Sequence, residues 1–221
     1  MDGTPSMSPL LALPIAFGVG LLAERMGWLR PGAAWAAALV GGLPMWAGGI
    51  PAALAVLFFV ALGSLASRWN QRSQDRSGRT AFQVLANGFP AALGLALGSP
   101  AFFLAALATA AADTLATELG SRSRWAWHPL KGRVKSGTNA AISGPGTLAL
   151  LGGALLFVPW AAWLEVPIAG VVLGGIAGAL ADTLLGLCED RWAWWSNDLT
   201  NLLATTLGGL VGVCLPWVFA A

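Results

Sequence analysis

The sequence is poor in charged residues, cysteine and histidine. Only 10% of its 221 residues are Asp, Glu, Lys or Arg, whereas soluble domains carry about 25%. With two cysteines and one histidine it lacks a cluster of zinc-ligating residues, and no Ser/His/Asp order indicates a hydrolase. We therefore interpret His128 as incidental. No polar segment is long enough to bury a core of its own, which argues against a separate soluble domain, and nothing indicates a nucleic-acid surface.

Apolar residues dominate instead. They make up 57% of the chain, and its mean hydropathy is +0.70. This composition indicates an all-α, polytopic integral membrane protein, because about 20 apolar residues form a helix that crosses a bilayer. We expect residues 1–221 to form a single transmembrane domain, one bundle of about eight helices, of which the second is short enough to be tilted or partly re-entrant. The expected helices are residues 9–26, 32–46, 50–67, 81–97, 100–120, 145–163, 167–188 and 199–219.

The positions of the basic residues predict the orientation of these helices. Of the 12 Lys and Arg residues, Arg25 lies at the end of the first expected helix, and the others fall in the connections after the first, third, fifth and seventh. Cytoplasmic loops carry an excess of Lys and Arg, so these connections are expected on the cytoplasmic side of the inner (plasma) membrane, with both termini outside. Tryptophans beside them are expected to form an aromatic belt. These are Trp125, Trp127, Trp192, Trp194 and Trp195.

Several carboxylates interrupt the apolar runs. Asp113 and Glu118 lie in the fifth expected helix, and Asp182 lies in the seventh. A carboxylate near mid-membrane costs about 2.5 to 3.5 kcal/mol on insertion scales, so such residues usually face a protein interior or a wet cavity and carry function. The tetrapeptide Ala-Asp-Thr-Leu occurs around both aspartates. If the two helices are parallel repeats, their aspartates take comparable positions.

With this topology, the polar groups all fall near the cytoplasmic ends of the helices. Hard oxygen ligands at such ends, beside a basic loop, indicate a site for Mg²⁺ and phosphate. The glycine-rich segment 136–147 permits turns that cradle anions, although it is not a P-loop. The residues expected to hold metal and to be catalytic are Asp113, Glu118, Asp182 and Asp198. The residues expected to bind substrate are Asn87, Lys131, Arg133, Lys135, Ser136, Gly137, Thr138, Asn139, Ser143, Asn197 and Asn201.

Five motifs in order carry a family resemblance. They are Gln83-Val-Leu-Ala-Asn-Gly88, Ala112-Asp-Thr-Leu-Ala-Thr-Glu-Leu-Gly120, the segment 137–147, Asp182-Thr-Leu-Leu-Gly186 and Asn197-Asp-Leu-Thr-Asn201. The chain resembles, over nearly its whole length, the integral-membrane family that includes transmembrane protein 19 and plant phytyl-phosphate kinase. The resemblance implies a kinase that phosphorylates isoprenoid (phytyl or prenyl) monophosphates with CTP or another nucleoside triphosphate and Mg²⁺. Ser196 stands where this family pattern has an acid.

Three other interpretations remain open at this stage. The same parts suit a cytidylyltransferase that acts on a lipid phosphate. An ion-coupled transporter is the alternative of a different class, although transporter sites tend to lie at the midplane between broken helices. Residue by residue, Asp113 and Asp182 also suit helix packing or proton relay, Asn197 and Asp198 suit a helix cap, and the basic loops suit topology alone. The sequence leaves homo-oligomerisation undecided.

Overall fold

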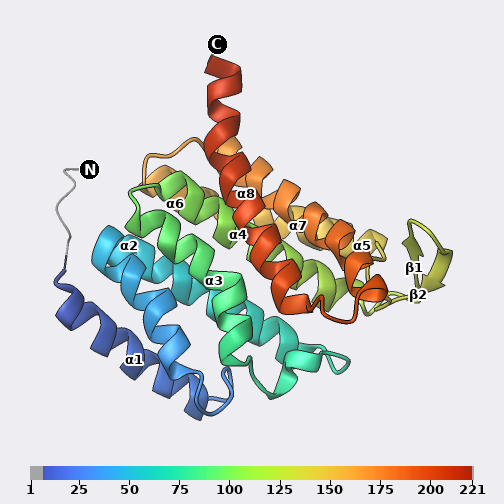
Figure 1. The fold of residues 1–221 in the computed structure, drawn as a ribbon, viewed down its shortest axis with the longest axis horizontal. Coiled ribbons are helices and arrows are strands. Elements are labelled where there is room, and N and C mark those ends of the chain that lie inside the picture. Colours follow the sequence, from blue (N-terminus) through green and yellow to red (C-terminus); the bar gives the residue numbers. More distant parts are fainter. Residues whose placement is uncertain (1–6, 221) are drawn as a thin grey trace.

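The computed structural model describes residues 7–220, which are mostly helical (Figure 1). The two terminal residues, which are predicted to lie on the outer side of the membrane, are not among the described residues. Two short strands form a hairpin between α4 and α5, a feature that the expected all-α architecture did not include. In chain order the elements are α1 (Pro9–Arg25), α2 (Ala34–Trp69), the 3₁₀ helix η1 (Gln74–Ser77), α3 (Ala81–Ala96), α4 (Pro100–Gly120), β1 (Trp125–His128), β2 (Gly132–Lys135), α5 (Gly144–Leu155), α6 (Val158–Trp163), α7 (Ile168–Arg191) and α8 (Asn197–Ala220).

The expected count of eight spans is not confirmed. Among the described residues, five helical segments are long and apolar enough to cross a membrane. The helices α1 and α3 have 17 and 16 residues, so at 1.5 Å per residue each is about 25 Å long, less than the roughly 30 Å of a hydrocarbon core. The five segments are Ala34–Trp69, Pro100–Gly120, Gly144–Trp163, Ile168–Arg191 and Asn197–Leu215.

Helix α2 contains both the second and the third expected helices. Gly49 lies between them with φ 66° and ψ −152°, a conformation that favours glycine and breaks the helix. Gly20 of α1 lies against Ala34 at the start of α2, and the Arg68 guanidinium at its other end donates to the Met26 carbonyl. Both ends of α2 therefore meet the same end of α1, and the chain reverses direction near Gly49.

Helix α4 is the centre of the bundle and packs against α2, α3, α5, α6, α7 and α8. Its residues 103–112 are almost completely buried. On one side the glycines of α7 and α8 allow close approach, since a Cβ on Gly174 would lie 2.6 Å from the Gly208 carbonyl oxygen. The side-chain hydroxyl of Thr109 occupies this contact and donates to the Ala105 carbonyl at 2.9 Å. Small residues therefore determine the packing here, and the four-residue spacing of Gly170, Gly174 and Gly178 in α7 suits such close contact.

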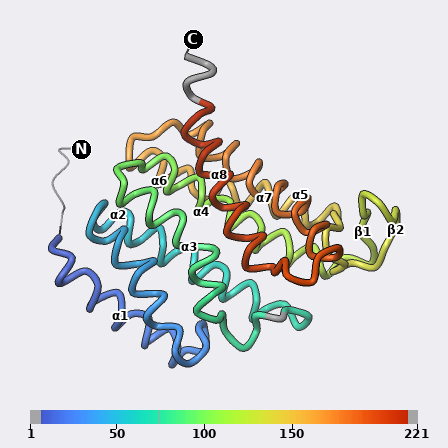
Figure 2. Tube along the Cα trace, in the orientation of Figure 1, coloured from blue at the N-terminus to red at the C-terminus, as the bar shows by residue number. Residues whose placement is uncertain are grey.

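The packing brings helix ends from distant parts of the sequence together at one end of the bundle. Figure 2 shows the loop after α2, the start of α8 and the connection around the hairpin at the same end of the molecule. At this end α4 and α7 finish, and α3, α5 and α8 begin. The loops and helix ends here provide the polar residues of the candidate site.

Candidate functional site

A cavity of about 870 Å³ lies among these helix ends. It is lined by the loop that follows α2, by α3, α4, α5, α7 and α8, and by the segment 136–143 after the hairpin. Most of the expected site residues line this cavity. They are Asn87, Asp113, Glu118, Ser136, Gly137, Thr138, Asn139, Ser143, Asp182, Asn197, Asp198 and Asn201.

Asp113 and Asp182 face each other across α4 and α7. Their carboxyl groups are near enough to interact with one another, and the Asp182 Oδ1 atom is buried without a hydrogen-bond partner among the described residues. Asp113 lies seven residues before the end of α4, about 10 Å along the helix. Two carboxylates this near repel each other when both are ionised, so a bound cation between them would relieve that repulsion.

Glu118 has a different environment, although it lies on the same helix. Its Oε1 accepts hydrogen bonds from the hydroxyls of Ser67 and Ser73, both at 2.6 Å, and its Oε2 accepts one from the Asn70 amide at 2.7 Å. These donors come from the end of α2 and the following loop, and Glu118 is only 6% exposed. The carboxylate therefore holds that loop against α4, so its oxygens are already occupied by protein donors.

Arg79 is a buried cation in the cavity wall. Its guanidinium donates to the Thr114 hydroxyl at 3.2 Å and lies over the Phe59 ring, 5.2 Å from the centroid. Gly63 makes room for it, because a Cβ there would collide with the guanidinium. Burial lowers the pKa of Arg79, and the charge of Asp75 opposes this shift most strongly. Among the described residues it has no carboxylate within salt-bridge distance, so the cavity wall carries a positive charge with hydrogen-bonding capacity to spare.

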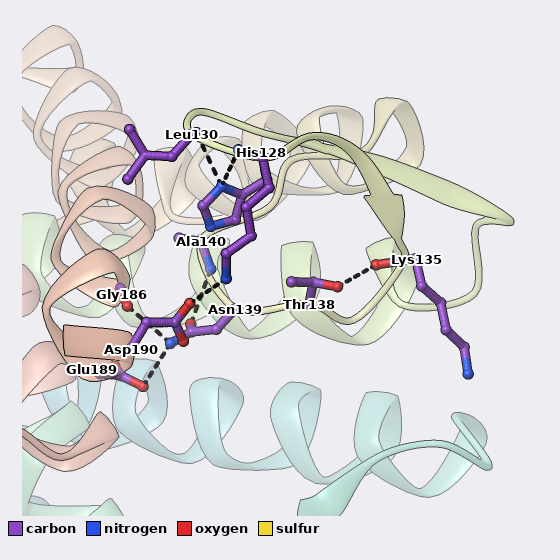
Figure 3. Close-up of polar contacts among 10 residues, drawn as sticks. His128, Leu130, Lys135, Thr138, Asn139, Ala140, Gly186, Glu189 and Asp190 are labelled. Atoms are coloured by element: carbon purple, nitrogen blue, oxygen red, sulfur yellow. Dashed lines mark hydrogen bonds and ion pairs between the residues drawn. The ribbon is translucent and has the colours of Figure 1, made fainter. Parts of the chain in front are cut away.

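The segment 136–143 forms another wall and is anchored at both ends. The hydroxyls of Ser136 and Ser143 both donate to the Gly120 carbonyl, at 2.6 and 3.2 Å. The Asn139 amide donates to the Gly186 carbonyl of α7 at 2.9 Å and to Glu189 at 3.1 Å (Figure 3). Ser143 also caps α5 by accepting from the Gly146 N–H at 3.2 Å. The expected glycine-rich segment thus connects α4, α5 and α7.

Two buried asparagines complete the wall. The Nδ2 group of Asn87 donates to the Gln83 carbonyl, and that of Asn201 donates to the Asn197 carbonyl, both at 3.0 Å. Among the described residues nothing donates to their amide oxygens, which remain available to a ligand. The N-terminal residues Asn197 and Asp198 of α8 lie beside them.

Lys131, Arg133 and Lys135 do not line the cavity. Lys131 forms an ion pair with Asp190 at 2.7 Å, and Arg133 lies over the Trp125 ring, while Figure 3 shows Lys135 directed away from α7. The reason is the hairpin, which the sequence interpretation missed. Alternating residues of a strand face opposite sides, and this alternation turns Arg133 and Lys135 outward.

His128 has a structural role in the hairpin turn rather than being incidental. Its Nδ1 accepts the backbone N–H groups of Leu130 and Lys131, both at 3.1 Å, and the side chain is fully buried (Figure 3). The histidine therefore satisfies two backbone donors that the turn would otherwise leave unpaired.

The loop 70–80 supplies site residues that sequence reasoning did not single out. Arg72, Asp75 and Arg79 all line the cavity. The sequence reasoning assigned the arginines to topology alone. A signal was present in Thr80-Ala-Phe-Gln83, which is the pattern of a capping box. The structure has this box, with Gln83 also donating to Asp75 at 2.7 Å, so the loop is fixed at the start of α3.

The expected four-acid metal site is not assembled as one group. Among the described residues no three His, Cys, Asp or Glu side chains lie close enough together to hold a metal, and Glu118 is occupied by its donors. The Asp113 and Asp182 pair nevertheless fits Mg²⁺, which is usually bound by one or two carboxylates and completes its coordination with waters and substrate phosphates. The buried, unpartnered Oδ1 of Asp182 favours this pair.

Comparison with known proteins places the chain among membrane proteins. A family model described as "Integral membrane protein DUF92" matches residues 14–209. The chain belongs to this family. The "Uncharacterized membrane protein MJ0933" of Methanocaldococcus jannaschii is 33% identical to it over 177 residues, which cover 72% of this chain and 74% of that protein. No solved structure matches. The chain is thus an integral, multi-pass membrane protein, as its composition predicts.

Proposed function

We propose that this DUF92 protein is a membrane phosphotransferase that phosphorylates an isoprenoid monophosphate to the diphosphate, using a nucleoside triphosphate, with CTP favoured. The observation that carries the proposal is that one cavity is lined by a pair of carboxyl groups and by arginines and helix N-termini. The carboxyl pair of Asp113 and Asp182, at the C-terminal halves of α4 and α7, favours a cation. Arg72, Arg79 and the N-termini of α3, α5 and α8 favour anions.

The chain's own residues can position both phosphates. In the reaction, an oxygen of the lipid phosphate forms a bond to the γ-phosphorus, the bond from that phosphorus to its bridging oxygen breaks, and the nucleoside diphosphate leaves. Arg79 and Arg72 would neutralise the transferring group, because Lys131, Arg133 and Lys135 do not line the cavity. The amides of Asn87 and Asn201 would orient the reactants. Mg²⁺ held by Asp113 and Asp182 would supply charge neutralisation to the triphosphate.

An apolar groove adjoins the polar cavity and suits the lipid chain. This groove, of about 420 Å³, runs between α3 and α8 and is almost entirely apolar, and it meets the cavity at Asp198, which lines both. An amphiphile can therefore place its phosphate in the cavity and its chain in the groove. The lining residues are Leu39, Phe82, Leu85, Ala86, Phe89, Asp198, Leu199 and Leu202.

Two alternatives share parts of this site. A lipid-phosphate cytidylyltransferase would use the same charges with CTP but would release pyrophosphate. An ion-coupled transporter would use the aspartate pair as a cation site. The cavity lies among helix ends and loops rather than between broken helices at mid-length, which favours an enzyme over a carrier.

A direct assay separates these functions. The purified protein in nanodiscs is incubated with CTP or ATP, Mg²⁺ and a panel of prenyl monophosphates, and products are identified by mass spectrometry. Prenyl diphosphate with nucleoside diphosphate supports the kinase. A CDP-lipid with pyrophosphate supports the cytidylyltransferase instead. If neither forms with any lipid, while proteoliposomes show flux that depends on Asp113, the carrier replaces the enzyme.

A further inference from the structure

The hairpin presents two different faces. β1 and β2 are antiparallel, with Trp125 opposite Lys135 and Trp127 opposite Arg133. Ala126 and His128 are buried, and Ala126 lines the cavity. Because successive side chains point to opposite faces of a strand, the two cross-strand pairs share the face that turns away from the cavity. We call this the outer face of the hairpin, defined by Trp125, Trp127, Arg133 and Lys135.

This outer face combines aromatic surface with unneutralised positive charge. Trp125 is 51% and Trp127 53% exposed. Within the described part of the chain, Arg133 and Lys135 form no ion pair, since the hairpin's one acidic contact is between Lys131 and Asp190. Each basic residue therefore stands beside an indole, and no carboxylate of the protein neutralises the pair.

The hairpin is held in a defined position. The ion pair between Lys131 and Asp190 ties the turn to the end of α7, and Trp127 exchanges two backbone hydrogen bonds of 2.8 Å with Ile142. His128 closes the turn from inside. The outer face consequently keeps its orientation relative to the bundle, at the end where the membrane-crossing segments α4 and α7 finish.

We propose that the outer face binds the headgroups of anionic lipids at the membrane surface. Tryptophan is favoured at membrane interfaces, where its ring is partly buried and its N–H stays hydrated. Lys and Arg near a leaflet are attracted to its anionic lipids. The ends of membrane-spanning helices lie beside a lipid headgroup layer. The positive charge of the outer face complements the negative charge of anionic headgroups in that layer. The proposal is independent of the reaction in the cavity.

Native mass spectrometry tests the lipid preference of this face. The ratio of apparent affinities for phosphatidylglycerol and phosphatidylcholine is compared between wild type and Arg133→Gln/Lys135→Gln. Each basic residue near an anionic surface contributes a factor of about five, so the double variant should lose at least about tenfold of the preference. The matched control is Arg25→Gln/Arg76→Gln, which removes the same charge from two exposed residues outside the hairpin and should lower the preference by a clearly smaller factor than the hairpin variant does.

A spin label measures whether the face lies at the membrane. The label is placed at Leu130, which is 79% exposed at the hairpin turn, in a background without Cys188 and Cys214. In nanodiscs containing phosphatidylglycerol the label should become more accessible to oxygen and less accessible to a water-soluble nickel chelate, and Trp125→Ser/Trp127→Ser should abolish this change. Equal effects of both charge variants, or a label that stays aqueous in every lipid, would overturn the proposal. A label that is protected only by an acidic soluble protein would assign the face to that partner.

Discussion

The cavity wall and the outer face of the hairpin both carry basic residues, but they use them in opposite ways. In the sequence the connections 68–80 and 121–144 are similar, since each is long and basic. The structure buries Arg79 of the first connection and exposes Arg133 and Lys135 of the second. The number of basic residues predicts on which side of the membrane both connections lie. It does not predict the role of either connection.

The difference arises from the helices against which each connection folds. Gly63 leaves space for the Arg79 guanidinium, Phe59 covers it and Thr114 accepts its hydrogen bond. The hairpin instead buries its small residue Ala126 against the bundle. Its long basic side chains, Arg133 and Lys135, therefore remain exposed on the opposite face. Burying a charge without a salt-bridge partner is unfavourable. An anionic ligand in the cavity would offset this unfavourable free energy for Arg79.

The largest expected effect comes from comparing two acids of α7. Asp182 lines the cavity, whereas Asp190 pairs with the hairpin. We expect Asp182→Asn to reduce turnover at least about a thousandfold, since a bound divalent cation contributes several kcal/mol. Asp113→Asn should behave alike. Both variants should melt no lower than wild type, because an amide is cheaper to bury than a carboxylate. Turnover with Mg²⁺ and thermal melting check this, with Asp190→Asn as the control that should keep activity.

The comparison of arginines should give the next largest effect. Arg79→Gln should lower turnover by about ten- to a hundredfold, the equivalent of one lost charge-assisted hydrogen bond of about 1.5–3 kcal/mol. Arg133→Gln should change turnover less than about twofold. Arg79→Lys, which keeps the charge but loses the fork, should fall between them. If Arg133→Gln were the more damaging change, the triphosphate would bind at the hairpin and the comparison would be reversed.

The position of the Arg79 guanidinium can be tested without mutating Arg79 itself, by filling the space that Gly63 leaves for it. Gly63→Ala places a methyl group where the guanidinium lies, so we expect Arg79 to be displaced and turnover to fall by about tenfold. Gly152→Ala is the matched control, because a Cβ there meets nothing within 4 Å. Kinetics of both variants decide the point, and equal activity would show that the position of Arg79 is unimportant.

A substitution of Glu118 tests whether this residue stabilises the fold and does not bind metal. In Glu118→Gln an amide NH₂ would face at least one of the donors Ser67, Asn70 and Ser73, so we expect a loss of roughly 1–3 kcal/mol in the free energy of unfolding. The variant should melt at a lower temperature while keeping bound Mg²⁺. Unchanged melting with lost Mg²⁺ binding would instead make Glu118 a metal ligand.

The smallest effect is expected at the ion pair between Lys131 and Asp190, which is largely exposed. Exposed pairs contribute about 0–1 kcal/mol, so Lys131→Ala should barely change the melting temperature or turnover. Adding 1 M salt should remove what difference there is. A tenfold loss of turnover in Lys131→Ala would show that the hairpin takes part in the reaction.

Part of the site was accessible from the sequence because it depends on local chemistry. Asp113 and Asp182 stand out because carboxylates are rare and costly in apolar helices, and the structure places them together. The capping pattern of Thr80 and Gln83 is local too, and marked the start of α3. In contrast, nothing local separates Glu118 from Asp113, since only the distant end of α2 and the loop after it determine that Glu118 receives three hydrogen bonds.

The sequence by itself determined a helical membrane protein, the approximate ends of its helices and the acids that need an explanation. Periodicity, glycine and charge are properties of neighbouring residues, so they can be read along the chain. Only the tertiary structure decided that α2 reverses at Gly49, that Arg79 is in the cavity wall and that Arg133 faces outward. These outcomes depend on which surfaces pack together, because burial of a long charged side chain is settled by the space that other helices leave for it.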